Sequence, residues 1–546
     1  MRRVAPLLAL PVVVAVFSCG SSSGGSSPSL DASTDSTASS SGAASSSSGT
    51  GSSGGSLADS SGSSGGPDAS AHPDSSSSPD SSSPDSSGSD SPADATVPIN
   101  PDAFYVSTTG DDTNPGTLAK PFLTLGQAQK AMQASKTSKT TYVRAGTYEP
   151  TASGGSCVWG DASGSSIGLS SADAGETWSF YPPDGYGSAI LDGQSTTGGS
   201  GGTGGNGTGC AFGASQMANV TIVGLQFQHY LYSAFWGWAV SGLTFEDNVV
   251  HDTTAASFSA GAVYLVASPG ALVANNYVHD VAYMGIVVSD NSTNGDSMSN
   301  STVSGNVVLD ACTYPAAPGG NDQDGGDCGG IYFWSQATTA STNLRITNNY
   351  VRDVNAASKG AGDFGTCCTV GIYLDDGTNN VTASGNVVTG STSSCFMIHG
   401  GQNNVFTGNL CDLGSTGAGV ILRYQDDSLT TMTGNSFEHN VVVAGSSAAG
   451  GGYAGSNSPP NPMTIADNAY FNYVGTSVDS TGSGGVGSDA SPTYESSGVT
   501  CWSPLLPPAS LVMAAPVSFP GIAGEFGPPG FTMPQTGTAP SWPHGC

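Results

Sequence analysis

The chain has 546 residues, of which 41 are Asp or Glu and only 11 are Lys or Arg, so its formal net charge is −30. A chain this acidic repels phosphate backbones, which argues against nucleic acid as a partner. The length would allow several domains, but long stretches contain too few apolar residues to form a core.

Residues 1–18 have the features of a secretory signal peptide. Two arginines precede an apolar run that ends at Phe17 and is too short to span a membrane. The sequence VFSC, which ends at Cys19, resembles a bacterial lipobox, in which the cysteine is diacylated and becomes the new amino terminus. We expect lipidation of Cys19 and export to the bacterial outer membrane or cell surface, with membrane contact only through that lipid. Ordinary cleavage nearby is the alternative.

Residues 19–98 are the predicted lipidated cysteine and its tether, which consists almost entirely of Ser, Gly, Asp, Pro and Ala. Such a segment buries too little apolar area to offset its conformational entropy. We expect a disordered, acidic linker that only holds the rest of the chain at a distance from the membrane.

The cysteine count favours export. If Cys19 carries lipid, ten of the 11 cysteines remain, an even number that can pair outside the reducing cytosol. No close CxxC pair occurs, so disulfides are favoured over a zinc site. The remaining cysteines are Cys157, Cys210, Cys312, Cys328, Cys367, Cys368, Cys395, Cys411, Cys501 and Cys546.

The folded part begins near Asp102. Residues 104–107 alternate like a strand, Thr124 and Gln127 form a capping box before a short helix at 125–134, and residues 141–144 form a second strand. The segment FYVSTTGDDTNPGTLAKPFLTL…TYVRAGTY resembles the first segment of right-handed parallel β-helix (pectate-lyase-like) proteins, many of which are polysaccharide lyases or glycoside hydrolases. The resemblance implies an all-β, single-stranded right-handed parallel β-helix over residues 99–475, with the helix as its N-terminal cap. It bears on the fold more than on the reaction, since this fold carries many chemistries.

An eight-fold recurrence of β-branched residues around an asparagine supports the solenoid. The step is 23 residues from Asn386 to Asn409 and 28 from Asn248 to Asn276, which is typical of stacked repeats. We interpret the asparagines as architectural, because Asn tolerates left-handed turns and stacked amides can hydrogen-bond in a ladder. The eight are Asn248, Asn276, Asn306, Asn349, Asn386, Asn409, Asn435 and Asn468.

A polar column is predicted on the strand that precedes each asparagine. Side chains alternate along a strand, so inward apolar pairs such as Ile372/Leu374 leave the next residue pointing outward. Aligned in this way, Trp334, Asp375, His399 and Arg423 form one outward column with a spacing of about 4.8 Å. The alternative is an ordinary solvated face. Flat side chains suited to sugar rings come from Trp334 itself and from Tyr332, Tyr373 and Tyr424.

Two insertions, near 311–329 and 354–370, precede the strands of Trp334 and Asp375 and would form the walls of a groove. The first contains Asp322, Asp324 and Asp327 at spacings that suit Ca²⁺, although the EF-hand pattern is absent. An acidic solvated loop is the alternative, so calcium is a possible cofactor and none is required.

Paired carboxylates suit glycoside hydrolysis, in which one protonates the leaving oxygen and the other attacks or activates water. GIYLDDGTNN followed by FMIHGG resembles a segment common in β-helix glycoside hydrolases, which implies Asp375 and Asp376 at the active centre beside His399. We therefore expect a monomer that binds and cleaves a polysaccharide. A calcium-dependent polysaccharide lyase that uses Arg423 is one alternative, which the acidic charge disfavours. A non-catalytic glycan-binding or structural surface protein is the other. Residues 476–546 are Gly- and Pro-rich, and we expect this tail to cover the last turn of the solenoid.

Overall fold

The computed structural model describes residues 99–149, 157, 165–194, 208–254, 260–290, 297–313, 327–336, 340–354, 369–413, 420–428, 430–444, 451–456, 459–472, 478–495, 499–501, 512–513, 527–528 and 531–532. The predicted signal peptide, Cys19 and the tether lie outside these residues. Among the helices of the described part, none is long and apolar enough to cross a membrane.

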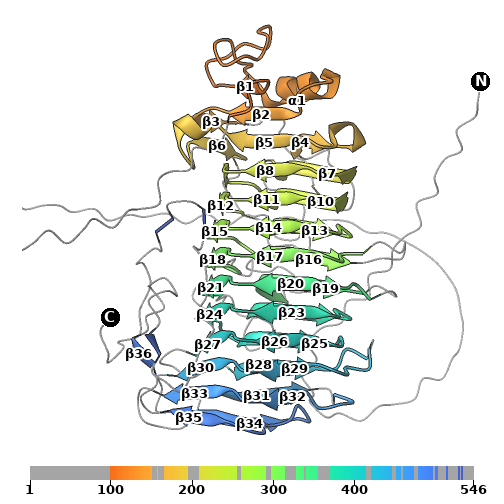
Figure 1. Ribbon diagram of the computed structural model, residues 1–546, viewed down its shortest axis with the longest axis vertical. Coiled ribbons are helices and arrows are strands. Elements are labelled where there is room, and N and C mark those ends of the chain that lie inside the picture. Colours follow the sequence, from red (N-terminus) through yellow and green to blue (C-terminus); the bar gives the residue numbers. More distant parts are fainter. Residues whose placement is uncertain are drawn as a thin grey trace, which may run out of the picture. The chain divides into compact units, whose positions relative to one another are not determined.

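The described strands form three stacked parallel sheets, and from residue 140 to residue 483 each turn of the chain adds one strand to sheet 1, then sheet 2, then sheet 3 (Figure 1). Sheet 1 contains β1 (Phe104–Val106), β2 (Thr140–Val143), β5 (Thr177–Phe180), β8 (Thr221–Val223), β11 (Thr244–Glu246), β14 (Leu272–Ala274), β17 (Thr302–Ser304), β20 (Leu344–Thr347), β23 (Val381–Ser384), β26 (Val405–Thr407), β29 (Ser436–Glu438) and β32 (Thr464–Ala466). Sheet 2 contains β3 (Gly146–Tyr148), β6 (Ala189–Asp192), β9 (Gln226–Gln228), β12 (Val249–His251), β15 (Tyr277–His279), β18 (Val307–Leu309), β21 (Tyr350–Arg352), β24 (Val387–Thr389), β27 (Leu410–Asp412), β30 (Val441–Ala444), β33 (Ala469–Asn472) and β35 (Thr493–Glu495). Sheet 3 contains β4 (Ser165–Leu169), β7 (Cys210–Ala218), β10 (Ser233–Ser241), β13 (Gly261–Val266), β16 (Met284–Asp290), β19 (Cys328–Ser335), β22 (Thr369–Asp376), β25 (Ser394–His399), β28 (Val420–Gln425), β31 (Gly451–Ser456) and β34 (Asp479–Ser483).

This arrangement confirms the predicted right-handed parallel β-helix. Parallel strands joined through the other two sheets follow the right-handed crossover rule. The inward positions carry the core, as the alternation predicted: Ile331, Phe333, Ile372 and Leu374 are fully buried. A two-stranded antiparallel pair, β36 (Val499–Cys501) and β37 (Val512–Met513), lies outside the three sheets.

The predicted asparagine ladder runs between sheets 1 and 2. Asn349 shows the pattern: its Nδ2 donates to Asn386 Oδ1 (3.0 Å) and to the carbonyl of Val303 (2.9 Å), while its Oδ1 accepts from Asn306 Nδ2 (2.9 Å). The left-handed backbone, which we had assigned to the asparagine, belongs to the residue before it, such as Gly385 with φ +66°. The asparagine is thereby free to point inward and bond along the stack.

One of the eight predicted positions is wrong. Asn409 Nδ2 donates to Asn440 Oδ1 (2.9 Å) and Asn440 Nδ2 to Asn468 Oδ1 (3.1 Å), so Asn440 takes the place that we had given to Asn435. The reason is that Asn435 precedes strand β29, whereas ladder asparagines follow the sheet 1 strand. The row ends at Asp489, whose Oδ2 accepts from Asn468 Nδ2 (2.9 Å).

The helix α1 (Leu125–Ala134) begins the described fold, next to β1 and β2 (Figure 1). Thr124 Oγ1 accepts from Gln127 N, but the N–H of Thr124 donates to Asp112 Oδ1 (2.9 Å), so an aspartate replaces the expected partner Gln127. Gln129 and Gln133 on this helix donate to Asp173 Oδ1, in the short 3-10 helix Ser171–Asp173 (a second one is Pro182–Asp184). The helix therefore caps the first turns through its amide side chains.

Glu176 is a buried carboxyl close to this cap. It accepts from Trp178 Nε1 (3.2 Å), and its Oε1 has no hydrogen-bond partner. Burial, followed by the charge of Asp173, raises the pKa of Glu176 to about 8.

The solenoid extends beyond residue 475, where we expected it to end. Strand β34 pairs with β31, and β35 pairs with β33. The tail also departs from expectation: Gly527 N donates to Gly305 O (3.0 Å), and Phe531 packs on Tyr277 with ring centroids 4.6 Å apart. These tail residues contact the middle turns of the solenoid rather than the last one. Cys546 lies outside the described residues.

Disulfides form, as the cysteine count predicted. The described pairs are Cys157–Cys210, Cys312–Cys328 and Cys395–Cys411. The second closes the first predicted insertion and fixes the start of β19, directly after Asp327. Cys367 and Cys368 lie outside the described part of the chain.

Candidate functional site

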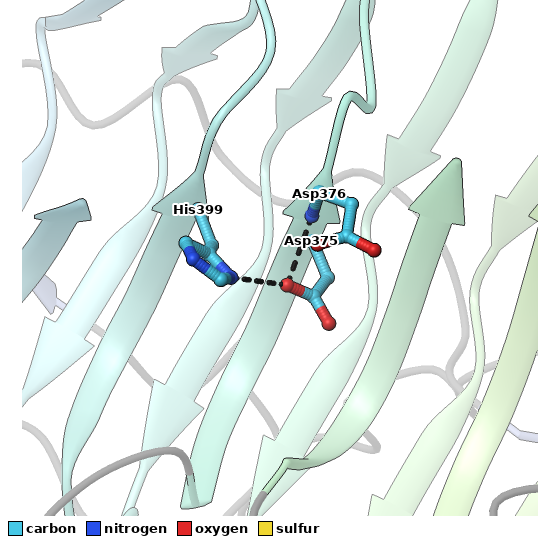
Figure 2. A group of neighbouring side chains, drawn as sticks. All are labelled: Asp375, Asp376 and His399. Carbon is cyan, nitrogen blue, oxygen red and sulfur yellow. Dashed lines mark hydrogen bonds and ion pairs between the residues drawn. The ribbon is translucent and has the colours of Figure 1, made fainter. Parts of the chain in front are cut away.

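The predicted outward column exists over three strands of sheet 3. Trp334 on β19 pairs with Asp375 on β22, and the pairing of Leu374 with Ile398 puts Asp375 next to His399 on β25. Figure 2 shows His399 and Asp375 pointing toward each other from neighbouring strands, with Asp376 beside them. The structure therefore brings together residues that are far apart in the sequence.

Arg423 does not belong to this column. Strand β28 is displaced by two residues from the predicted register, so Arg423 pairs with Met397 and Gln425 pairs with His399. The Nε of Arg423 donates to Ser393 Oγ (2.7 Å). Arg423 thus lies on the same face of sheet 3, but in the other outward row, and Gln425 takes its predicted place.

Tyr424 is in the core, which corrects its predicted role in substrate binding. With the displaced register, Leu422 and Tyr424 fill the two inward positions of β28, and Tyr424 is fully buried. Its hydroxyl donates to Met432 O (3.0 Å) and accepts from Asn435 Nδ2 (3.1 Å). No part of this side chain is available to a sugar.

Tyr332 and Tyr373 point outward but are 6% and 0% exposed, so they do not present the flat surfaces we predicted. Their rings meet edge to face, with centroids 5.0 Å apart. The Tyr332 hydroxyl donates to Asp375 Oδ2, and the Tyr373 hydroxyl donates to Asp327 Oδ1 (3.1 Å). Both tyrosines support the carboxylates instead of forming a platform.

Asp375 is the centre of the cluster and is 4% exposed. Its Oδ1 accepts from His399 Nδ1 (2.7 Å) and from the backbone N–H of Asp376 (2.9 Å), and its Oδ2 accepts from Tyr332. A carboxylate only accepts hydrogen bonds, so three donors from three directions fix its position.

Asp376 ends β22 with a left-handed backbone (φ +48°), which turns its side chain toward the outer edge of the site. Its Oδ2 accepts from Trp334 Nε1 (2.5 Å) and from Gln336 Nε2 (2.8 Å). Gln336 is exposed and Trp334 half-buried, so this carboxyl lies on the accessible side. Burial, followed by the charge of Asp375, raises the pKa of Asp376 to about 6.

The surroundings of His399 favour its charged form, whereas those of Asp376 favour the neutral one. Burial lowers its pKa, but the hydrogen bond and charge of Asp375 outweigh that effect and raise the pKa to about 9. Its Nε2 lies 3.2 Å from Gln425 Nε2. Nearby, burial and the charge of Asp375 raise the pKa of Asp327 to about 7. The site therefore combines one cationic imidazole with carboxyls that gain protons near neutral pH.

The predicted calcium residues are only partly described. Asp322 and Asp324 lie outside the described residues, and Asp327 Oδ1 accepts the hydroxyl of Tyr373. One ligand atom each from Asp375, Asp376 and His399 lie within 4.8 Å of one another, a spacing that fits a cation. A cation there would compete with N–H and O–H donors, because both oxygens of Asp375 and Oδ2 of Asp376 already accept hydrogen bonds from such groups.

Sequence reasoning missed Gln336 and Gln425. Gln336 follows directly after β19, where the alternation of a strand no longer predicts which way a side chain points. The position of Gln425 depends on a displacement by two residues, which leaves the alternating pattern unchanged.

No family model and no curated protein matches the sequence. Solved structures do match. A GH136 lacto-N-biosidase from Eubacterium ramulus is 13% identical with a TM-score of 0.39, over 72% of this chain and 68% of that one. The catalytic domain of a GH87 alpha-1,3-glucanase is 11% identical with a TM-score of 0.43, over 73% and 66%, and an alginate lyase from Paenibacillus sp. str. FPU-7 is 12% identical with a TM-score of 0.36, over 60% and 95%.

At these identities, and with TM-scores below 0.5, the likeness carries no argument about this chain. The three parallel sheets, joined in the same order at each turn from β2 to β34, define a right-handed parallel β-helix independently of any relative. By its architecture the chain belongs to the right-handed parallel β-helix proteins.

Proposed function

We propose that the protein is a carbohydrate-active enzyme that cleaves a polysaccharide by glycoside hydrolysis at the Asp375–Asp376–His399 cluster. The observation that carries this proposal is a pair of adjacent carboxyls in unequal surroundings. Asp375 is bound by three donors, whereas Asp376 lies on the accessible side and has a pKa of about 6. Two carboxyl groups that differ in this way divide the roles of acid and carboxylate between them.

Asp376 is the general acid in this mechanism. At a pH near 6 it is protonated in about half of the molecules and can donate to the oxygen of the leaving sugar. Trp334 and Gln336 hold its Oδ2, which leaves Oδ1 as the oxygen that faces the substrate. Asp375 is the negative partner that stabilises or attacks the developing oxocarbenium ion, and His399 holds it in position.

The experiment is a screen of the purified chain against neutral and acidic glycans, with and without a calcium chelator. New reducing ends would identify a hydrolase, and proton NMR of the first product would give the anomeric outcome. Asp376→Asn should lower turnover by about 10²–10⁴-fold and leave the melting temperature unchanged. Asp280→Asn, a half-exposed carboxyl on sheet 2, is the matched control and should retain full activity. Normal turnover of Asp376→Asn would exclude it as the acid.

A calcium-dependent polysaccharide lyase is the second candidate. Two positive groups favour it: His399, with a pKa of about 9, and Arg423, two strand spacings from Tyr373 in the same outward row. Such groups neutralise a uronate before its proton is removed. Products with ultraviolet-absorbing unsaturated ends, lost on chelation, would identify the lyase. Binding without cleavage of any glycan would instead support a non-catalytic surface protein.

We also propose that the protein is an exported lipoprotein whose only membrane contact is the lipid on Cys19. The signal sequence and the VFSC motif support this. In a bacterial host, the native chain should fractionate with membranes and Cys19→Ala should not. Equal distribution of the two would contradict the anchor.

A further inference from the structure

The outer face of sheet 2 becomes apolar and buried in the later turns of the solenoid. The middle residue of each short strand, such as Val388, points into the core, so the first residue of the strand points outward. From β18 to β33 this outward row is apolar. It consists of Val307, Tyr350, Val387, Leu410, Val441 and Ala469, which pair in register, and we call it the sheet-2 strip.

The strip is buried although it faces away from the core. None of its six members is more than 6% exposed, and together with three neighbours they form a hydrophobic cluster separate from the main core. On the earlier strands β12 and β15, the residues of the same row, Val249 and Tyr277, are only half-buried. Outward residues of a sheet stay dry only when another segment covers them, so the strip has an occupant.

The C-terminal segment contacts the first end of this strip. Phe531 packs on Tyr277, which pairs with Val307 and so stands directly next to the strip. Gly527 N donates to Gly305 O, two residues before Val307. Phe531 and Tyr277 are the partly buried residues that pack against the strip's cluster.

Length and composition allow the rest of the segment to cover the strip. Between β35 and β15 lie seven strand spacings, or about 34 Å at 4.8 Å each. Because β36 and β37 pair antiparallel, Met513 lies back beside Val499, and only the four residues from Glu495 to Val499 and the 18 from Met513 to Phe531 span the distance. Fully extended, they reach about 73 Å, still twice what is needed. Residues 502–546 contain one acid, Glu525, no Lys or Arg, and many Pro, Leu, Val and Phe residues. Because proline has no backbone N–H, such a segment has few donors that need a partner. It can therefore pack against a face that offers only apolar side chains.

We propose that residues 514–531, which follow the β36–β37 pair, form an intramolecular strap whose binding site is the sheet-2 strip. The strap shields the extended apolar face of the described solenoid from solvent, so that the chain stays monomeric. The polar column of Trp334, Asp375 and His399 on sheet 3 is then the face that is open to a glycan. The inference does not depend on the reaction proposed for that column.

Photo-crosslinking in the full-length protein tests the occupant. A benzophenone amino acid replaces Phe519 or Phe526, both aromatic in the native chain, and the product is digested and analysed by mass spectrometry. We expect crosslinks within one chain, to peptides of β18 to β30, independent of protein concentration. The same probe at Thr532, which is exposed, should give few such crosslinks. Crosslinks between two chains would show that a second copy covers the strip, and none to sheet 2 would also overturn the proposal.

A substitution tests the anchor. Phe531→Asp should detach the segment and raise its rate of proteolytic cleavage about tenfold or more, with increased binding of a hydrophobic dye and concentration-dependent association. Thr532→Asp adds the same charge one residue away and should behave as the native chain. Equal cleavage of the two variants would overturn the strap, whatever the glycan assays show.

Discussion

The outer faces of sheets 2 and 3 are built by the same alternation and serve different ends. On sheet 3, the outward positions of β19, β22 and β25 carry Trp334, Asp375 and His399. His399 bonds to Asp375, and Asp376 links Asp375 to Trp334. On sheet 2, the equivalent positions of β18 to β33 are apolar and lie under another segment. Tyr332, Tyr373 and Asp375 on sheet 3 are about as buried as the strip, so burial alone does not distinguish a functional face from a structural one. The difference lies in whether the buried outward groups are linked hydrogen-bonding groups or apolar ones.

A charge placed on the structural face should have the largest effect on stability. Val387→Asp puts an unpaired carboxylate in the middle of the sheet-2 strip, and we expect a loss of about 3–5 kcal/mol in the free energy of unfolding, measured by denaturant titration. Thr382→Asp, on the exposed face of β23, is the control and should stay within about 0.5 kcal/mol. If the two variants were equally stable, the strip would be open to water.

The asparagine ladder supports both faces, since it lies at the turn between the sheets. Asn349→Ala removes an amide that serves Asn306, Val303 and Asn386, leaving buried polar groups unpaired. We expect a loss of about 3 kcal/mol by the same measurement. Asn461→Ala removes one exposed hydrogen bond, from its Nδ2 to Thr431 O, and should cost less; the reverse order would contradict the assignment.

A change on the functional face should move a pH profile with little effect on folding. Trp334→Phe keeps an aromatic ring but removes the hydrogen bond to Asp376, a contact that lowers the pKa of that carboxyl. The pKa of Asp376 should rise, and the alkaline limb of kcat/KM should move upward by about 0.5–1 pH unit. An unmoved limb would mean that Asp376 is not the group that donates the proton.

Glu176 provides a buried carboxyl that belongs to neither face. Its pKa is raised from 4.5 to about 8 in the folded chain, so folding favours the protonated form. Its contribution to stability is complete below pH 4.5 and is lost as the pH rises through about 8. Glu176→Gln should remove this decline, making the variant relatively more stable at pH 8 than at pH 5 in thermal melts, with glycan cleavage unchanged. Parallel pH curves for the two proteins would refute the assignment.

The fold was predictable because it follows from a repeat in the sequence. Repeated β-branched runs around an asparagine fixed the stacking, and the sequence near 104–148 supplied the cap. The errors arose where two alignments satisfy the same pattern. Asn435 and Asn440 both flank β29, and only the strand's sheet decides between them. In β28, Val420, Leu422 and Tyr424 are all apolar, so a shift by two keeps an apolar core and moves Arg423 away from His399.

Part of the candidate site was predictable for the same reason. The neighbours Trp334, Asp375 and His399 follow from alternation and equal spacing, which the strands of sheet 3 obey. The roles of Tyr332 and Tyr373 did not follow, because alternation gives the direction of a side chain and not what covers it. Their hydroxyls reach Asp375 and Asp327 beneath the surface, and no local pattern specifies such partners.

The end of the asparagine ladder has a consequence for the length of the solenoid. After the first, every amide in the row accepts a hydrogen bond from the asparagine before it in the stack and donates one to the residue after it. Asp489 receives from Asn468 and from the hydroxyl of Tyr470, yet a carboxylate has no N–H to pass on. The row therefore has a polarity and a chemical stop, so a further coil, or the first coil of another molecule, would find no donor there to continue it.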